Sequence, residues 1–273
     1  MKKIFMALCM VAFAIVGCGD DESWSPSARA NDEPGVESSS SGVTPQSSDS
    51  ETSVSTGTMT DSRDGQTYRT VKIGTQTWMA ENLNYAYTGV PYNYSGNTSD
   101  STSWCYKNEP ENCAKYGRLY TWAAAMDSVG TWTTNGKGCG YGSECSPTGT
   151  IRGICPEGWH LPDTTEWNTL FSAVGGISTA GTALKSTSGW NEYEGESGNG
   201  TDSFGFSALP AGCRHGDGDY GYEGYHADFW SSTENGSYNA YDLYLGYSND
   251  YAGLYGSSLY YGRSVRCLKD GAE

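Results

Sequence analysis

The chain has 273 residues, of which only 18% are charged, and it contains 37 glycines and 21 tyrosines. This composition excludes coiled coils and helical bundles, which are rich in alanine, glutamate, lysine and leucine. The formal net charge is −16 and the sequence has no basic patch, so nucleic acid and anionic lipid surfaces are disfavoured as partners.

Residues 1–17 have the pattern of an export signal. Met1-Lys2-Lys3 is positively charged, and residues 4–16 form an apolar stretch that is too short to span a bilayer. The following Ile15-Val16-Gly17-Cys18 resembles a bacterial lipobox, which implies cleavage before Cys18 and attachment of lipid to its sulfur. Acyl chains such as palmitate then hold the protein on a membrane. The alternative is an ordinary secretory signal that happens to contain a cysteine.

Residues 18–60 predict a lipidated cysteine followed by a disordered tether. Serine, threonine, acidic residues, proline and glycine dominate this segment, and it cannot bury enough apolar surface to offset its ordering entropy. Gly19-Asp20-Asp21-Glu22 resembles the surface-export signals of some Gram-negative lipoproteins, although linker acidity explains it equally well. We therefore expect an exported protein that is lipid-anchored to the cell envelope at the outer membrane, with exposure on the cell surface as an open alternative.

Seven cysteines remain after Cys18. In an oxidising compartment they indicate disulfides, and their positions favour Cys105–Cys113, Cys139–Cys145 and Cys155–Cys267. This pairing leaves Cys213 over. A metal site is the rival interpretation, but no pair has C-x-x-C spacing and the chain has only three histidines.

The folded head is expected to cover residues 61–270. Within it, residues 68–79 predict a β-hairpin whose strands flank Gly74-Thr75, and glycine first in a two-residue loop suits a type II′ turn. Apolar residues at helical spacing predict a helix over 119–126. A second helix is predicted over 163–174, with Asp163 as its cap.

The remaining segments predict short strands and loops. The strand candidates are residues 204–209, 229–231, 241–245 and 264–268. Two helices followed by a loop-rich set of strands predict an α+β fold and not a doubly wound sheet.

Several stretches together resemble the Fibrobacter succinogenes major paralogous domain, a family of exported bacterial proteins. They include VKIGTQTWMAENL at 71–83, GRLYTWAAAM at 117–126, ICPEGWHLP at 154–162 and SVRCLKD at 264–270. In addition, residues 160–167 are similar to a signature of the sulfatase-modifying-factor fold. That similarity implies a C-type-lectin-like architecture, with a small twisted, mostly antiparallel sheet, two helices and long loops rich in glycine and tyrosine.

No catalytic constellation stands out. The sequence lacks a G-x-S-x-G nucleophile elbow, and no spacing singles out a pair of catalytic carboxylates. His160 lies between Trp159 and Leu161, so a hydrogen-bonded structural role is favoured over catalysis. Enzymes of the sulfatase-modifying-factor type use two redox-active cysteines, and Cys213 alone cannot replace them. An enzyme therefore remains an unsupported alternative.

The tyrosines of the loop at 215–225 are the candidate binding residues. Tyr220, Tyr222 and Tyr225 lie among glycines, where a flat apolar ring with a polar tip suits the recognition of sugars. Packing of these rings on the sheet is an equally weighted alternative. Trp159, Trp167 and Trp230 are assigned to the core.

The same loop carries three acidic residues, Asp217, Asp219 and Glu223. Their oxygens are the ligand type that Ca²⁺ prefers, but a complete calcium-loop pattern is missing and a solvated acidic turn is the favoured interpretation. Calcium is therefore an open cofactor hypothesis.

These observations together predict a stalked, disulfide-stabilised head that binds an extracellular ligand, with glycan or polysaccharide as the favoured class. A protein-binding or structural surface adhesin is the first alternative, and a sulfatase-modifying-factor-type enzyme is the second.

Overall fold

The computed structural model describes residues 54–94, 97–99 and 102–271. The predictions for the signal segment, for Cys18 and for nearly all of the tether therefore lie outside the described residues. Within the described part, no helix combines the length and the hydrophobicity that crossing a bilayer requires.

A five-stranded antiparallel sheet joins the two ends of the head. Its strand order is β1-β2-β3-β16-β8. The strands are β1 (Ser55–Thr60), β2 (Thr67–Ile73), β3 (Gln76–Met79), β8 (Trp159–His160) and β16 (Leu268–Lys269). The C-terminal strand β16 thus lies in the middle of the sheet, between β3 and β8.

The head begins earlier than the composition predicts. Residues 55–60, which the sequence assigns to the tether, form β1 and pair with β2 from Ser55↔Lys72 to Thr60↔Thr67. The side chains of β1 are almost all exposed, so this strand is held by its backbone hydrogen bonds and not by apolar burial. Its composition therefore resembles a linker although it belongs to the sheet.

The predicted hairpin is confirmed. β2 and β3 pair up to Ile73↔Gln76 and leave Gly74 and Thr75 as the loop. Gly74 has φ +59° whereas Thr75 has no positive φ, as a type II′ turn requires.

A second sheet is an antiparallel meander of three strands, β13 (His226–Glu234), β14 (Asn239–Gly246) and β15 (Ala252–Ser258). It contains the predicted strands 229–231 and 241–245. The predicted strand at 204–209 is absent, because Ala208 makes only an isolated bridge to Lys185. Of 264–268, only Leu268 belongs to a named strand, and Ser264 makes one parallel bridge to Phe229.

The described residues contain four α-helices instead of the two predicted. They are α1 (Pro110–Tyr116), α2 (Trp122–Ala125), α3 (Thr164–Ala173) and α4 (Ile177–Leu184), and a 3₁₀ turn, η1 (Tyr106–Asn108), precedes α1. α3 is confirmed, with Asp163 and Glu166 forming a capping box.

The helix predicted over 119–126 is partly wrong. Leu119–Tyr120 is strand β7, paired with β6 (Ser103–Trp104), and only the single turn of α2 follows. α4 was not predicted, because Gly181 weakens its helical pattern. A Cβ at Gly181 would lie 2.5 Å from the Tyr251 carbonyl oxygen, so glycine permits the close contact of α4 with that loop.

Three further ladders are short and antiparallel. They pair β4 (Tyr92–Tyr94) with β5 (Asn97–Ser99), β9 (Glu192–Tyr193) with β10 (Glu196–Ser197), and β11 (Cys213–Arg214) with β12 (Tyr220–Gly221). The fold is thus α+β with mostly antiparallel sheets.

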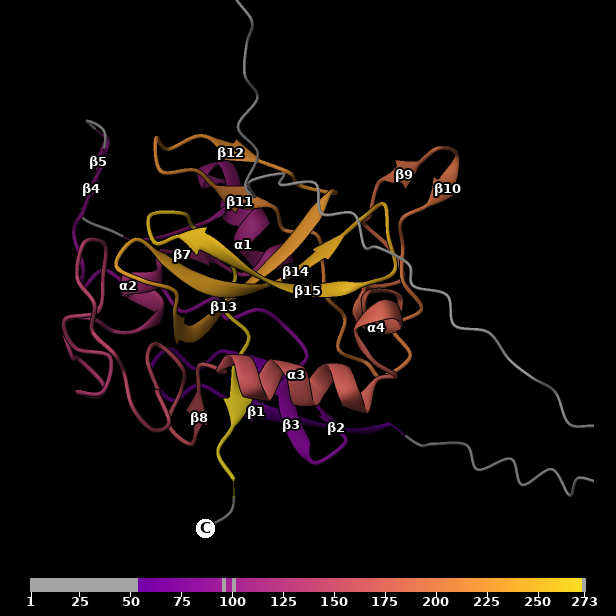
Figure 1. The fold of residues 1–273 in the computed structure, drawn as a ribbon, viewed down its shortest axis with the longest axis horizontal. Helices are drawn as coiled ribbons and strands as arrows, with labels where there is room; N and C mark the ends of the chain where they lie inside the picture. Colours follow the sequence, from indigo (N-terminus) through magenta and orange to yellow (C-terminus); the bar gives the residue numbers. More distant parts are fainter. Residues whose placement is uncertain (1–53, 95–96, 100–101, 272–273) are drawn as a thin grey trace, which may run out of the picture. The chain divides into compact units, whose positions relative to one another are not determined.

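Helix α3 packs between the two large sheets, as Figure 1 shows, and its Trp167 stacks on Trp78 of β3 with ring centroids 4.7 Å apart. Trp159, Trp167 and Trp230 are all buried, so their assignment to the core is confirmed.

The three expected disulfides are present, at Cys105–Cys113, Cys139–Cys145 and Cys155–Cys267. Cys213 is fully buried in β11 and is disulfide-bonded, so the expectation of a spare cysteine is wrong. The Cys155–Cys267 bridge ties the segment before β8 to the segment before β16 and spans 112 residues.

We predict that the long bridge stabilises the fold more than a short one. Replacing Cys155 and Cys267 by alanine should lower the free energy of unfolding by about 5 kcal/mol, whereas replacing Cys139 and Cys145 should lower it by about 2 kcal/mol, because the unfolded chain gains more freedom when a longer loop is opened. Urea unfolding followed by tryptophan fluorescence measures both losses. Equal losses would contradict the loop-length argument.

Candidate functional site

The acidic loop predicted from the sequence is the turn between β11 and β12. Asp217 and Asp219 are exposed, and the Asp219 amide donates to Asp217 Oδ1 at 3.1 Å. Glu223 points elsewhere, because its Oε1 accepts from the Tyr116 hydroxyl at 2.9 Å and lies 3.9 Å from Lys115 Nζ. Asp217 and Asp219 therefore lie on a solvated turn, whereas Glu223 contacts side chains of α1.

This arrangement does not support the calcium hypothesis. In the part of the chain that the structure describes, no group of three or more histidine, cysteine or acidic side chains could hold a metal ion. The three loop carboxylates are close in sequence but do not converge in space.

The three predicted tyrosines lie in three different environments. Tyr220 is half-buried, its hydroxyl donates to Asn108 Oδ1 at 2.8 Å, and burial raises its pKa. Tyr225 is 42% exposed and contacts Tyr247, which packs against the core beneath the β13–β15 sheet. Tyr222 stacks on His226 of β13, with parallel rings 4.5 Å apart. Only Tyr222 therefore joins a larger aromatic array.

That array is a row of rings across the outer face of the β13–β15 sheet, which we call the tyrosine face. It consists of Tyr222, His226, Tyr244, Tyr255 and Tyr251. The His226–Tyr244 centroids are 4.9 Å apart and the Tyr244–Tyr255 centroids 5.6 Å apart. The Tyr255 hydroxyl donates to the Tyr251 hydroxyl at 3.4 Å. Tyr255 and Tyr251 are 46% and 40% exposed, so one end of the row is open to solvent.

Glycines set the orientation of these rings. A Cβ at Gly253 would lie 2.5 Å from Tyr255 Cε2, and a Cβ at Gly246 would lie 2.7 Å from the Tyr244 hydroxyl oxygen. Each ring therefore lies along its own strand, over the glycine two residues away on the same face. Glycine covered by a neighbouring aromatic ring is a known packing device in sheets.

A sequence model of the Fibrobacter succinogenes major domain matches residues 71–269, from β2 to β16. The chain belongs to this family. The resemblance inferred from the sequence motifs is thereby confirmed. No curated protein and no solved structure matches the chain.

In this Fibrobacter succinogenes major domain, the tyrosine face ends at a buried ionic group. Arg263 lies 2.5 Å from Asp228 of β13 and 2.9 Å from Asp242 of β14, and it donates to Ser257 of β15 at 2.7 Å. Burial opposes the charge of Arg263, but the two carboxylates outweigh that effect and raise its pKa. One arginine thus links all three strands.

Two carboxylates share this single arginine, so one negative charge is left over in the interior. Burial raises the pKa of Asp242 from 3.8 to about 7, and the neighbouring Asp228 adds to this shift while Arg263 opposes it. Burial of this acidic pair therefore favours its taking up a proton near neutral pH.

His160 of the domain has the structural role expected from its sequence context. Its Nδ1 lies 2.7 Å from Asp270 and its Nε2 lies 2.8 Å from Glu166, the residue that also completes the cap of α3. Burial lowers the pKa of His160, but the two carboxylates outweigh this and raise it overall. The ring therefore connects the C-terminal segment to α3.

A second group of exposed tyrosines lies on other elements of the domain. Tyr260, Tyr94 and Tyr141 form a triangle of rings, with the Tyr260 centroid 4.1 Å from Tyr94 and 4.2 Å from Tyr141, and Tyr238 contacts Tyr141. The sequence did not indicate this group or the tyrosine face, because their members come from loops and strands that are distant along the chain. The pairs Tyr244/Gly246 and Gly253/Tyr255, each two residues apart, were a signal in the sequence for the strand members of the tyrosine face.

We predict that the free energy of unfolding falls as the pH rises from about 5 to about 8, and that Asp242→Asn reduces this fall. The pKa of Asp242 is higher in the folded protein than its ordinary value, so its contribution is complete below pH 3.8 and is lost as the pH rises through about 7. His160 contributes with the same sign and is retained in the variant.

Urea unfolding at several pH values measures this effect. Asp219→Asn, on the exposed turn, is the matched control and should keep the wild-type slope. An unchanged slope in Asp242→Asn would show that the buried cluster does not take up the proton.

Proposed function

We propose that this protein is a lipid-anchored cell-envelope lipoprotein whose head binds an extracellular glycan through the tyrosine face. The observation that carries the proposal is the row of aromatic rings on the outer face of the β13–β15 sheet, in which Tyr244 meets its neighbours edge to face and which is open to solvent at Tyr251 and Tyr255. A C-type-lectin-like architecture for the head is part of this proposal, and the lipobox-like segment supports the anchor.

Flat tyrosine rings suit sugars for a physical reason. The face of each ring covers the apolar C–H surface of a pyranose, while the hydroxyl at its edge exchanges hydrogen bonds with sugar hydroxyls. Tyrosine has few rotatable bonds, and the underlying glycines already fix the rings, so little side-chain entropy is lost on binding. Tyr244 and Tyr255 therefore form the centre of the proposed site.

The composition of the surface favours a glycan over a protein partner. Among the described residues, most of the large apolar side chains that are exposed are tyrosines, and the tyrosine face itself contains no aliphatic side chain and no arginine. Protein hot spots usually combine aromatic residues with arginine in desolvated pockets. A row of phenol rings with exposed hydroxyls instead matches an extended polyol.

We predict that the Tyr255→Ala and Tyr251→Ala variants lose most of their retention on insoluble polysaccharide. Each ring removed from a stacking site should weaken binding by about 1 kcal/mol or more, or at least about fivefold. Pull-down of the full chain with a panel of insoluble polysaccharides, followed by a glycan array, measures the loss. Retention should be insensitive to EDTA, since the described residues contain no cluster that could hold a metal.

Tyr225→Ala is the matched control, because Tyr225 is equally exposed but packs with Tyr247 instead of the row. If Tyr225→Ala alone loses retention on polysaccharide, the binding site lies in the loop at 215–225 and not on the tyrosine face. Retention of partner cells or proteins, without retention of any polysaccharide, would favour the adhesin alternative.

We also predict that Gly253→Ala weakens binding although every tyrosine is kept. The added Cβ would lie 2.5 Å from Tyr255 Cε2, so the ring must tilt away from the strand. The backbone of Gly253 has no positive φ, so alanine is compatible with the strand and the domain should stay folded. The same pull-down, with circular dichroism to check folding, measures the effect. Undiminished retention would show that the orientation of the ring over the strand is unimportant.

A further inference from the structure

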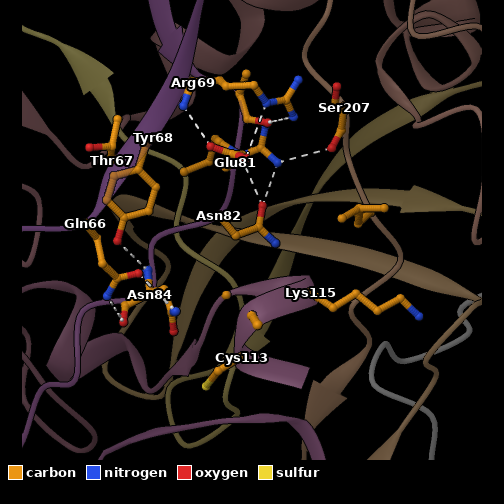
Figure 2. A pocket seen from close by; sticks show the side chains of 15 residues that line it. Gln66, Thr67, Tyr68, Arg69, Glu81, Asn82, Asn84, Cys113, Lys115 and Ser207 are labelled. Atoms are coloured by element: carbon orange, nitrogen blue, oxygen red, sulfur yellow. Dashed lines mark hydrogen bonds and ion pairs between the residues drawn. The ribbon is translucent and has the colours of Figure 1, made fainter. Parts of the chain in front are cut away.

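A polar hollow lies between the β2–β3 hairpin and α1, away from the tyrosine face. Its volume is about 270 Å³, and Figure 2 shows the side chains that line it, which come from the hairpin, from α1 and from the loop at Ser207. The wall carries three cations, Arg69, Lys115 and Arg266, and one acid, Glu81. In a chain with a net charge of −16, this local excess of positive charge is unusual.

Arg266 provides the decisive feature of the hollow. It is 1% exposed, yet it makes no salt bridge with any described residue. Its guanidinium donates to neutral oxygens only, namely Asn82 Oδ1 at 2.6 and 3.1 Å and the carbonyls of Met79, Phe206 and Ser207. Ser207 adopts a left-handed conformation, with φ 54°, where its carbonyl meets Arg266.

Arg266 thus differs in one respect from Arg263, the other fully buried arginine of the segment 263–268. Arg263 is neutralised by Asp228 and Asp242, whereas Arg266 donates only to neutral oxygens, and the carboxylates of Asp202 and Glu81 act on it without forming a salt bridge. Burial accordingly lowers the pKa of Arg266 to about 9. A buried charge without a partner is unfavourable, and an anion in the adjoining hollow would relieve that penalty.

The rim adds direct contacts for such an anion. The side chains of Arg69 and Lys115 are 59% and 53% exposed, and each lies near one acidic side chain: Arg69 is 3.3 Å from the exposed Glu81 and Lys115 is 3.9 Å from the half-buried Glu223. Planar amides of Gln66 and Asn84 lie beside them. Amide and carboxylate groups next to cations suit a molecule that carries hydroxyls as well as a carboxylate.

We propose that this hollow is a second binding site, for a small hydroxylated carboxylate of the sugar-acid class. The volume of about 270 Å³ is near the lower limit of ligand-pocket volumes. A hollow of this size accommodates one sugar-acid unit. The net charge of the whole chain repels a polyanion, so the ligand carries a single carboxylate or presents one at a chain end. This site does not depend on the tyrosine face.

Isothermal titration calorimetry of the full chain with galacturonate and with galactose tests the proposal, because the two sugars differ in the carboxylate alone. Galacturonate should bind at least about tenfold more tightly than galactose, and its affinity should fall with added salt. A neutral oligosaccharide that carries one galacturonate at its end, compared with the monomer, shows whether the carboxylate comes from a chain end or from a free sugar acid.

Single variants locate the site. Lys115→Gln and Arg69→Gln should each weaken galacturonate binding by about fivefold. Lys107→Gln is the matched control, because it removes the same charge from an exposed position outside the hollow and should have no effect. Tyr255→Ala should also leave galacturonate binding unchanged, which separates this site from the tyrosine face.

Hydrogen exchange should show protection by galacturonate at residues 80–84 and 113–117. Four results would each overturn the proposal. They are protection at 244–255 instead, an equal affinity for galactose, an equal loss of affinity in Lys107→Gln, and the absence of saturable heat below about 10 mM galacturonate.

Discussion

The segment 263–268 is the constraint on which the rest of the head depends. Its backbone hydrogen-bonds to both large sheets: the Cys267 and Val265 carbonyls accept from Met79 and Leu83, and the Ser264 carbonyl accepts from Trp230 of β13. The Cys155–Cys267 disulfide and the insertion of β16 between β3 and β8 fix its far end. Both candidate sites are built on this one segment.

Its two arginines serve different sides of the domain. Arg263 joins the three strands at the end of the tyrosine face, and Arg266 joins the end of the hairpin to the Phe206–Ser207 turn beside the hollow. A buried ion pair is weak evidence for stability, because desolvation offsets much of the attraction. What Arg263 provides is a fixed alignment of β13, β14 and β15, and the rings of the tyrosine face depend on that alignment for their spacing.

The sequence was most informative where local rules decide the structure. The hairpin at Gly74-Thr75, the capping box of α3 and the disulfide pairs depend on spacing that can be read along the chain. It failed where contacts with distant segments decide. β1 is held by pairing with β2 alone, and the Leu119 end of a helical pattern becomes a strand because Ser103–Trp104 lies beside it.

The candidate site likewise combines a feature that the sequence predicts with contacts between distant segments that it does not predict. A surface rich in tyrosine and glycine could be expected from composition, but its members could not. Of the loop tyrosines, Tyr220 is fixed by Asn108 and Tyr225 packs with Tyr247, and only Tyr222 joins the row. The other rings follow from the register Tyr244↔Gly253 and Asp242↔Tyr255, which becomes visible only when the strands are paired.

The two proposed sites rely on opposite physics, and this difference explains how an acidic head could use both. Stacking on the tyrosine face depends on contact area between uncharged groups, so the net charge of −16 neither helps nor hinders it. The hollow depends on the unpaired charge of Arg266, which acts over a few ångströms through a poorly screened interior while the surface charge is screened by salt. The protein can therefore hold a neutral polysaccharide on the tyrosine face and a single carboxylate in the hollow at the same time. Stacking does not change the charge around Arg266, and the bound carboxylate does not change the contact area of the rings.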